Sequence, residues 1–136
     1  MILFDNIKNG LDSFLSKNSK YAPLLTTVPS DGTFPNVVIE KIDDREHACD
    51  NTRNSVFSTW SIELNIYAVS TTFENKRISA RSVAVELEDL IRQYLGEKMG
   101  LRRTYDKPTP NVDQSVYRIT MRFQVKINDK RNSFIR

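Results

Sequence analysis

The chain has few of the residues that support covalent or metal chemistry. It contains one cysteine, Cys49, and one histidine, His47. A single thiol cannot form an intrachain disulfide, which suits a reducing compartment. The four glycines are scattered, and none opens a Gly-rich turn between a strand and a helix. The sequence therefore predicts no phosphate-binding loop.

Long apolar runs are absent as well. No stretch approaches the roughly 18 apolar residues that a membrane-spanning helix needs, and the first residues lack the basic and apolar regions of a secretory signal. Among the 136 residues, 39% are hydrophobic and 27% are charged, which is typical of a soluble globular domain. We expect one domain over residues 1–136. The 20 Lys and Arg residues against 17 Asp and Glu give a net charge of +3, which alone does not indicate nucleic-acid binding.

The strongest pattern is an alternation of apolar and polar residues from Ser115 to Ile127. It predicts a β-strand with one buried face, far longer than the usual 5 to 6 residues or so. A similar alternation predicts a second long strand from Val56 to Ala68. The expected inward residues of the first strand are Tyr117, Ile119, Met121, Phe123, Val125 and Ile127, and the outward ones are Arg118, Thr120, Arg122, Gln124 and Lys126.

Two amphipathic helices accompany these strands. Apolar residues recur at helical spacing from Leu3 or Phe4 to Leu15, and again from Ala80 to Tyr94. Thr71 and Glu74 have the spacing of a capping box ahead of the second helix. We expect that helix to end at Gly96 or Gly100.

The remaining segments are shorter or more polar. We expect a strand over Asn36–Ile42, a projecting loop over Asp43–Ser55, a short strand over Leu101–Tyr105 and a polar tail over Asn128–Arg136. Pro108 and Pro110 indicate a turn-rich connector. The order helix, strand, strand, helix, strand, strand predicts an α+β fold in two layers. Its mainly antiparallel sheet has four strands, with both helices packed on one face.

Candidate reactive groups lie in the predicted loop. His47 and Cys49 stand two residues apart among carboxylates, which suggests a zinc site completed by Asp or Glu, or a Cys–His nucleophilic pair. A structural zinc site usually takes four Cys or His ligands, and a nucleophile needs an orienting group and an oxyanion site. The simpler interpretation is a solvated polar loop. We expect no catalytic residue, no metal and no cofactor.

A second group of acids lies on the predicted second helix. Glu86, Glu88 and Asp89 stand beside Arg92. An exposed charged helix face explains these carboxylates better than acid and base catalysis does. The sequence therefore predicts that the protein is not an enzyme.

The outward cations of the last long strand admit three interpretations. Arg118, Arg122 and Lys126 could face solvent, contact another subunit, or contact phosphates. A nucleic-acid surface should also present stacking aromatic residues between the cations. Tyr117 and Phe123 instead share the apolar face, so nucleic acid is the weakest of the three.

The succession of elements resembles the tail terminator, or tail completion, proteins of long-tailed bacteriophages. The resemblance covers nearly the whole chain, including a helix expected to open near Asn75 and Lys76. Its strings are Phe34 to Ile39, Trp60 to Tyr67, Pro108 to Asn111 and Tyr117 to Phe123. It implies a small, non-enzymatic α+β subunit that assembles as a ring, usually a hexamer, on the head-proximal end of the tail tube.

In that family the ring stops tube growth and joins the tail to the head connector. The resemblance thus implies as partners a second copy of the chain, the tube protein and the connector, with passing contact to DNA in the lumen and none to a membrane. It also implies a location in the virion, after a period in the host cytoplasm. Our hypothesis for the subunit or tube interface is Arg45, Arg53, Arg118 and Arg122. A stopper or adaptor of the same junction, or a nucleic-acid-binding module, are the alternatives.

Overall fold

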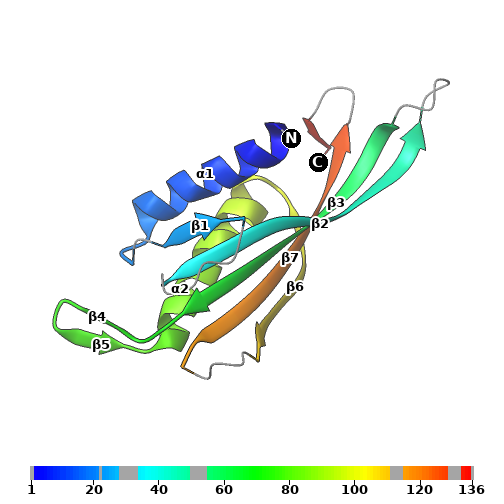
Figure 1. Ribbon diagram of the computed structural model, residues 1–136. Helices are drawn as coiled ribbons and strands as arrows, with labels where there is room; N and C mark the ends of the chain where they lie inside the picture. Colours follow the sequence, from blue (N-terminus) through cyan, green and yellow to red (C-terminus); the bar gives the residue numbers. More distant parts are fainter. Residues whose placement is uncertain are drawn as a thin grey trace.

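The computed structural model describes residues 2–21, 23–27, 34–49, 55–110, 115–128 and 133–135. Its main sheet has the strand order β1-β2-β3-β7-β6, with β8 paired to β7 and a separate β4–β5 hairpin (Figure 1). The strands are β1 (Leu24–Thr26), β2 (Asn36–Cys49), β3 (Ser55–Ala68), β4 (Thr71–Phe73), β5 (Lys76–Ile78), β6 (Arg102–Thr109), β7 (Tyr117–Asn128) and β8 (Ser133–Ile135).

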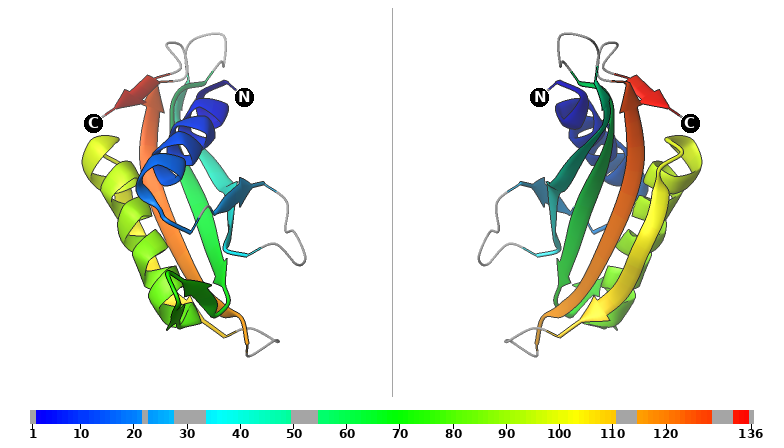
Figure 2. Two further views of the ribbon diagram at one scale, coloured as in Figure 1. Left: turned by 90° about the vertical axis from the view of Figure 1, so that its left-hand side faces the viewer. Right: turned by 90° about the vertical axis from the view of Figure 1, so that its right-hand side faces the viewer.

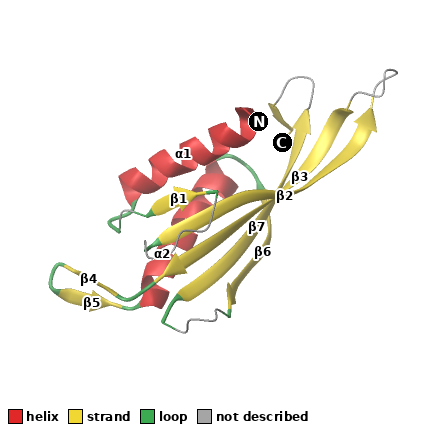
Figure 3. Ribbon diagram, in the orientation of Figure 1, coloured by secondary structure: helices red, strands yellow, loops and turns green. Residues whose placement is uncertain are grey.

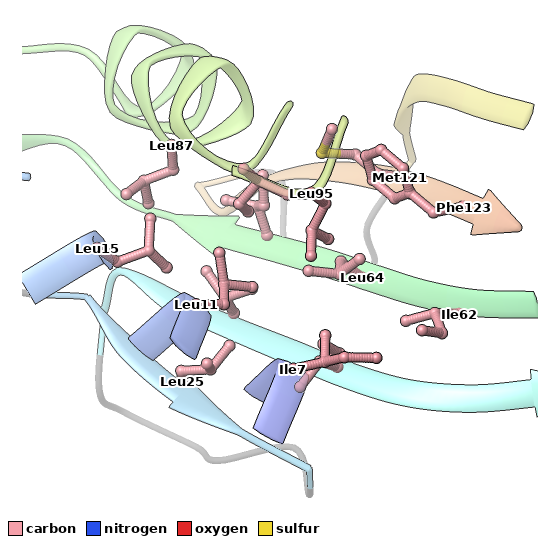
Figure 4. Close-up of a cluster of buried hydrophobic side chains, with 14 of the residues drawn as sticks. Ile7, Leu11, Leu15, Leu25, Ile62, Leu64, Leu87, Leu95, Met121 and Phe123 are labelled. Carbon is pink, nitrogen blue, oxygen red and sulfur yellow. The ribbon is translucent and has the colours of Figure 1, made fainter. Parts of the chain in front are cut away.

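Both helices cover the same face of this sheet and leave the other face bare (Figures 2 and 3). They are α1 (Ile2–Asn18) and α2 (Ala80–Ile91), which continues as the π-helical segment η1 (Arg92–Lys98). Apolar side chains from α1, α2 and the inward positions of β3 and β7 meet in one core (Figure 4). The predicted inward residues of β7 from Ile119 to Ile127 are buried, and Tyr117 is half-buried. The α+β class and the packing of helices on a sheet are confirmed.

The predicted number of strands, four, was wrong, and the sheet is mixed, although all of its pairings except β1–β2 are antiparallel. β1 runs parallel to β2 along Asn36 to Val38, and it is too short to produce a periodic signal in the sequence. The predicted polar tail includes β8, which pairs with the end of β7. Its backbone pairing extends the sheet without requiring an apolar pattern.

The predicted capping box was also wrong. Thr71 belongs to β4, and Glu74 lies in the tight turn to β5 with a positive φ of 51°. The helix begins instead at Ala80, because the Ser79 side chain accepts a hydrogen bond of 3.2 Å from the backbone N–H of Ser82. The other end agrees with the second predicted stop, since Gly100 has a φ of 77° that favours glycine.

The predicted loop over Asp43–Ser55 is largely a continuation of the ladder. β2 runs on to Cys49 and pairs with β3, which begins at Ser55. We call residues 42–49 and 55–61 the hairpin arm. Charged side chains disfavour strands only weakly when neither face must enter a core, and backbone pairing decides the structure here. Register shifts on β2, the first between Lys41 and Asp43, interrupt the arm.

β6 is longer than the short strand expected over Leu101–Tyr105. It continues to Thr109 and includes Pro108, which was predicted to lie in a connector. β6 is the last strand of the sheet order on its side. An edge strand tolerates proline, because one side of its backbone needs no ladder hydrogen bond.

Candidate interaction surface

The bare face of the sheet gathers polar side chains from β3, β7 and β6. Residues directly opposite one another across a ladder share a face, so the register places Ser61 of β3, Gln124 of β7 and Arg102 of β6 in one row. The next row holds Glu63, Arg122 and Tyr105 in the same order. Three strands therefore contribute neighbouring charged and polar groups to this face.

A groove of about 690 Å³ lies on this face, between the hairpin arm and β6. Four of its residues are cationic and one is acidic, so we call it the basic groove. Its lining residues are Ile42, Asp43, Arg45, Thr59, Ser61, Gly100, Arg102, Thr104, Arg122, Gln124, Val125 and Lys126.

The four cations of the groove differ in their partners. Arg45 Nε lies 3.0 Å from Asp43 Oδ2, and Arg122 Nη2 lies 3.7 Å from Glu63 Oε1. Neither Arg102 nor Lys126 forms an ion pair with any residue that the structure describes. Carboxylates among the described residues thus neutralise the positive charge of the groove only in part.

Two tyrosine rings on the bare face are covered by guanidinium groups. Arg122 lies 5.0 Å from the ring centroid of Tyr105, and Arg118 lies 5.4 Å from that of Tyr67. These aromatic residues do interleave with cations, contrary to the sequence analysis, which considered only β7. Cation–π contacts of this kind hold the guanidinium over the ring.

The four predicted interface residues differ in where they lie. Arg45 and Arg122 both line the basic groove, whereas Arg53 lies outside the described residues. Arg118 is half-buried and donates from Nε and Nη2 to Asn65 Oδ1, at 3.0 and 2.9 Å. The Arg118 guanidinium is therefore engaged within the sheet, and its role at an interface stays a prediction.

Arg102 is the groove residue that sequence reasoning missed. The sequence predicts a short strand there, but it does not indicate on which face of the sheet Arg102 lies, because the pairing partner of the strand cannot be predicted. Pairing with Gln124 places it beside the cations of β7. Only strand pairing, which brings residues far apart in sequence together, provides this information.

The carboxylates of α2 were predicted to form an exposed charged face beside Arg92, and they are only partly exposed, with Asp89 paired to Arg92 at 2.6 Å. Glu86, Glu88 and Asp89 are all half-buried. Burial, followed by the nearby Asp106 carboxyl, raises the pKa of Glu88 to about 7. Asp106 lies on β6, opposite the buried Met121, so it reaches this helix from the sheet. The chain thus contains a pair of carboxyl groups that the sequence did not indicate.

The two candidate reactive residues, His47 and Cys49, lie on β2 rather than in a loop. Their side chains are outside the described part of the structure. Among the side chains that are described, no three His, Cys, Asp or Glu residues are grouped so that they could hold a metal ion. The prediction that these residues form no site stays a prediction.

Apolar exposure is concentrated at a few points. Phe57 on the hairpin arm is 39% exposed, Ile42 at the base of the arm 41%, and Leu24 on β1 40%. Val85 of α2 is partly buried and packs against the core. None of the described helices is long and apolar enough to cross a membrane.

Comparison with known proteins leaves the family open. No protein-family model matches the chain, and the search of curated proteins found no match. The hairpin arm and the basic groove are therefore the features of the described structure that bear on function.

Proposed function

We propose that the protein is a subunit of a ring at the head-proximal end of a phage tail tube, where it stops tube growth and joins the tail to the head. The observation that carries this proposal is the hairpin arm. The far halves of β2 and β3 reach beyond the ends of both helices (Figure 1). Trp60 of the arm belongs to the core, but the arm beyond it lies past both helices, so this outer part is available to contact another subunit.

The sheet edge beside the arm supports the same role. β1 pairs with β2 only along Asn36 to Val38, and no described strand covers the outer edge of β2 beyond that point. An open edge can accept a strand from a neighbour by sheet extension. Closed rings are built from heterologous contacts, in which one surface of a subunit meets a different surface of the next. An arm and an open edge on one subunit supply two such surfaces.

Phe57 gives this proposal a specific contact. Its side chain is 39% exposed on the arm, where an apolar group gains free energy if a neighbouring subunit covers it. Arg45 lies on the arm and Arg122 on β7 in the same groove, and both remain candidate contacts with a subunit or the tube. Arg118 is a poor test residue, because its loss would disturb the sheet as well as any interface.

Native mass spectrometry of the purified protein, followed by electron microscopy, tests the proposal. We expect a closed ring, usually a hexamer in proteins of this kind. Phe57→Ser should reduce the ring fraction at a given concentration, whereas Leu24→Ser, which changes an equally exposed apolar residue on β1, should leave it unchanged. A strictly monomeric protein, with or without tail tubes present, would contradict a ring-forming function.

A second measurement separates the terminator from other proteins of the junction. We expect the ring to bind the ends of purified tail tubes and to prevent further polymerisation of tube protein. Binding to the head connector without binding to tubes would identify a stopper or adaptor instead.

A further inference from the structure

We propose that the basic groove binds an acidic polypeptide segment of a partner protein. The proposal concerns the chemistry of one surface on a single subunit and does not depend on ring formation.

The distribution of charge is the first argument. Four cations, Arg45, Arg102, Arg122 and Lys126, line the groove with one carboxylate, Asp43. Among the described residues Arg102 and Lys126 have no ion-pair partner. They lie on neighbouring strands, since Arg102 is opposite Gln124, two residues before Lys126. A partner with carboxylates would find two uncompensated cations close together.

The neutral groups of the groove are the second argument. Thr59, Ser61 and Gln124 line it from β3 and β7, and Thr104 lines it from β6. Their hydroxyl and amide groups both donate and accept hydrogen bonds, as a peptide backbone does. The groove crosses strands spaced about 4.8 Å apart, so an extended segment of about five residues, at about 3.3 Å each, would span it.

Two features favour a polypeptide over a nucleic acid. Ile42, which is 41% exposed, offers an apolar contact at the rim. The Tyr105 ring already carries the Arg122 guanidinium at 5.0 Å, so it is poorly placed to stack on a base.

Fluorescence anisotropy tests the proposal with a defined probe. The probe is a fluorescein-labelled peptide of about eight glutamate and serine residues around one central leucine, somewhat longer than the groove. We compare the wild type with the double variant Arg102→Glu/Lys126→Glu. The matched control is Lys17→Glu/Arg81→Glu, which makes the same change in net charge at exposed positions on α1 and α2.

We expect the groove variant to weaken peptide binding at least ~10-fold and the control to weaken it by less than ~2-fold, because charge reversal acts most strongly on contacts in the site. Arg102→Gln/Lys126→Gln should give an intermediate loss. Its circular dichroism melting curve should match the wild type, which shows that lost binding is not lost folding.

Two outcomes would overturn the proposal. In one, the peptide fails to bind the wild type, or loses as much affinity in the control as in the groove variant. In the other, an oligothymidylate of similar length binds more tightly than the peptide and is the ligand that the groove variant loses, which would identify a nucleic-acid surface. Native mass spectrometry of the groove variant, expected to be unchanged, keeps this result separate from the ring proposal.

Discussion

Arg118 of β7 reaches diagonally across the ladder to Asn65 of β3 and donates two hydrogen bonds to its Oδ1, at 3.0 and 2.9 Å. Thr120 Oγ1 donates a third to the same oxygen at 2.7 Å. Asn65 and Thr120 are buried although they face away from the helices. The bare face of the sheet is therefore ordered by a polar network at this end and open at the groove.

Removal of the Arg118 guanidinium should destabilise the monomer. Arg118→Met leaves Asn65 Oδ1 with a single donor, and we expect the free energy of unfolding to fall by about 1–2 kcal/mol. Urea unfolding followed by the fluorescence of Trp60, the one tryptophan, measures this. Lys126→Met, at an exposed cation of the same strand, should change it by less than about 0.5 kcal/mol. Equal effects would show that the network contributes nothing.

The carboxyl pair of Glu88 and Asp106 should make stability depend on pH. Asp106 Oδ1 is buried and has no hydrogen-bond partner among the described groups, while Oδ2 lies 3.2 Å from Arg103 Nη1. A proton on Glu88 can supply the missing donor, which agrees with its pKa being raised to about 7. Asp89 also raises this pKa and Arg92 lowers it, as smaller influences.

The sign follows from proton binding. Between pH 4.5 and about 7 the folded protein holds a proton on Glu88 that the unfolded chain has lost. The contribution of Glu88 to the free energy of unfolding is therefore fully present below pH 4.5 and is lost as the pH rises to about 7. Because Glu88 is partly exposed, we expect a loss on the order of 1 kcal/mol. Glu88→Gln should remove this dependence in urea unfolding at several pH values, and Glu97→Gln, an exposed acid of η1, should retain it. An unchanged slope in Glu88→Gln would exclude the pair as its cause.

The start of α2 should depend on Ser79 and not on Thr71. Ser79→Ala removes the acceptor for the backbone N–H of Ser82, and we expect a loss of about 1 kcal/mol in thermal or urea unfolding. Ser79→Asp should restore most of it, because aspartate also caps helices well. Thr71→Ala should leave the helix boundary unchanged in amide hydrogen exchange. If protection at Ser82 survived in Ser79→Ala, this cap would not be important.

Gly10 in α1 should be constrained by Tyr94. A Cβ at Gly10 would lie 3.2 Å from Cζ of Tyr94 and closer still to its hydroxyl, and the Tyr94 ring is stacked against Phe14. We expect Gly10→Ala to lower the free energy of unfolding by about 1 kcal/mol through crowding. In a Tyr94→Leu background the same change should raise it by about 0.5–1 kcal/mol, because alanine favours a helix.

Gly96 provides the control for this double-mutant cycle. No heavy atom lies within 4 Å of a Cβ built there, so Gly96→Ala should not destabilise the protein in either background. Additive effects of Gly10→Ala and Tyr94→Leu would mean that a methyl group added at position 10 does not contact the Tyr94 ring.

The sequence alone determined the two long strands, the two amphipathic helices and the α+β class. In these elements apolar residues recur with the period of a strand or a helix, because one face of each element is buried. The end of the second helix near Gly100 could also be predicted, because the left-handed backbone conformation that ends a helix favours glycine.

Only the tertiary structure decided the rest. The hairpin arm and β8 are held by backbone pairing, which leaves no apolar pattern, so the sequence predicts a loop at charged residues such as Asp43 and Glu46. Pairing of β6 with β7 brought Arg102 to the groove and Asp106 to Glu88, and the diagonal reach to Asn65 engaged Arg118 within the sheet. The sequence thus specified which apolar residues form the core, whereas strand register decided which charged residues meet, because register joins positions that no local pattern connects.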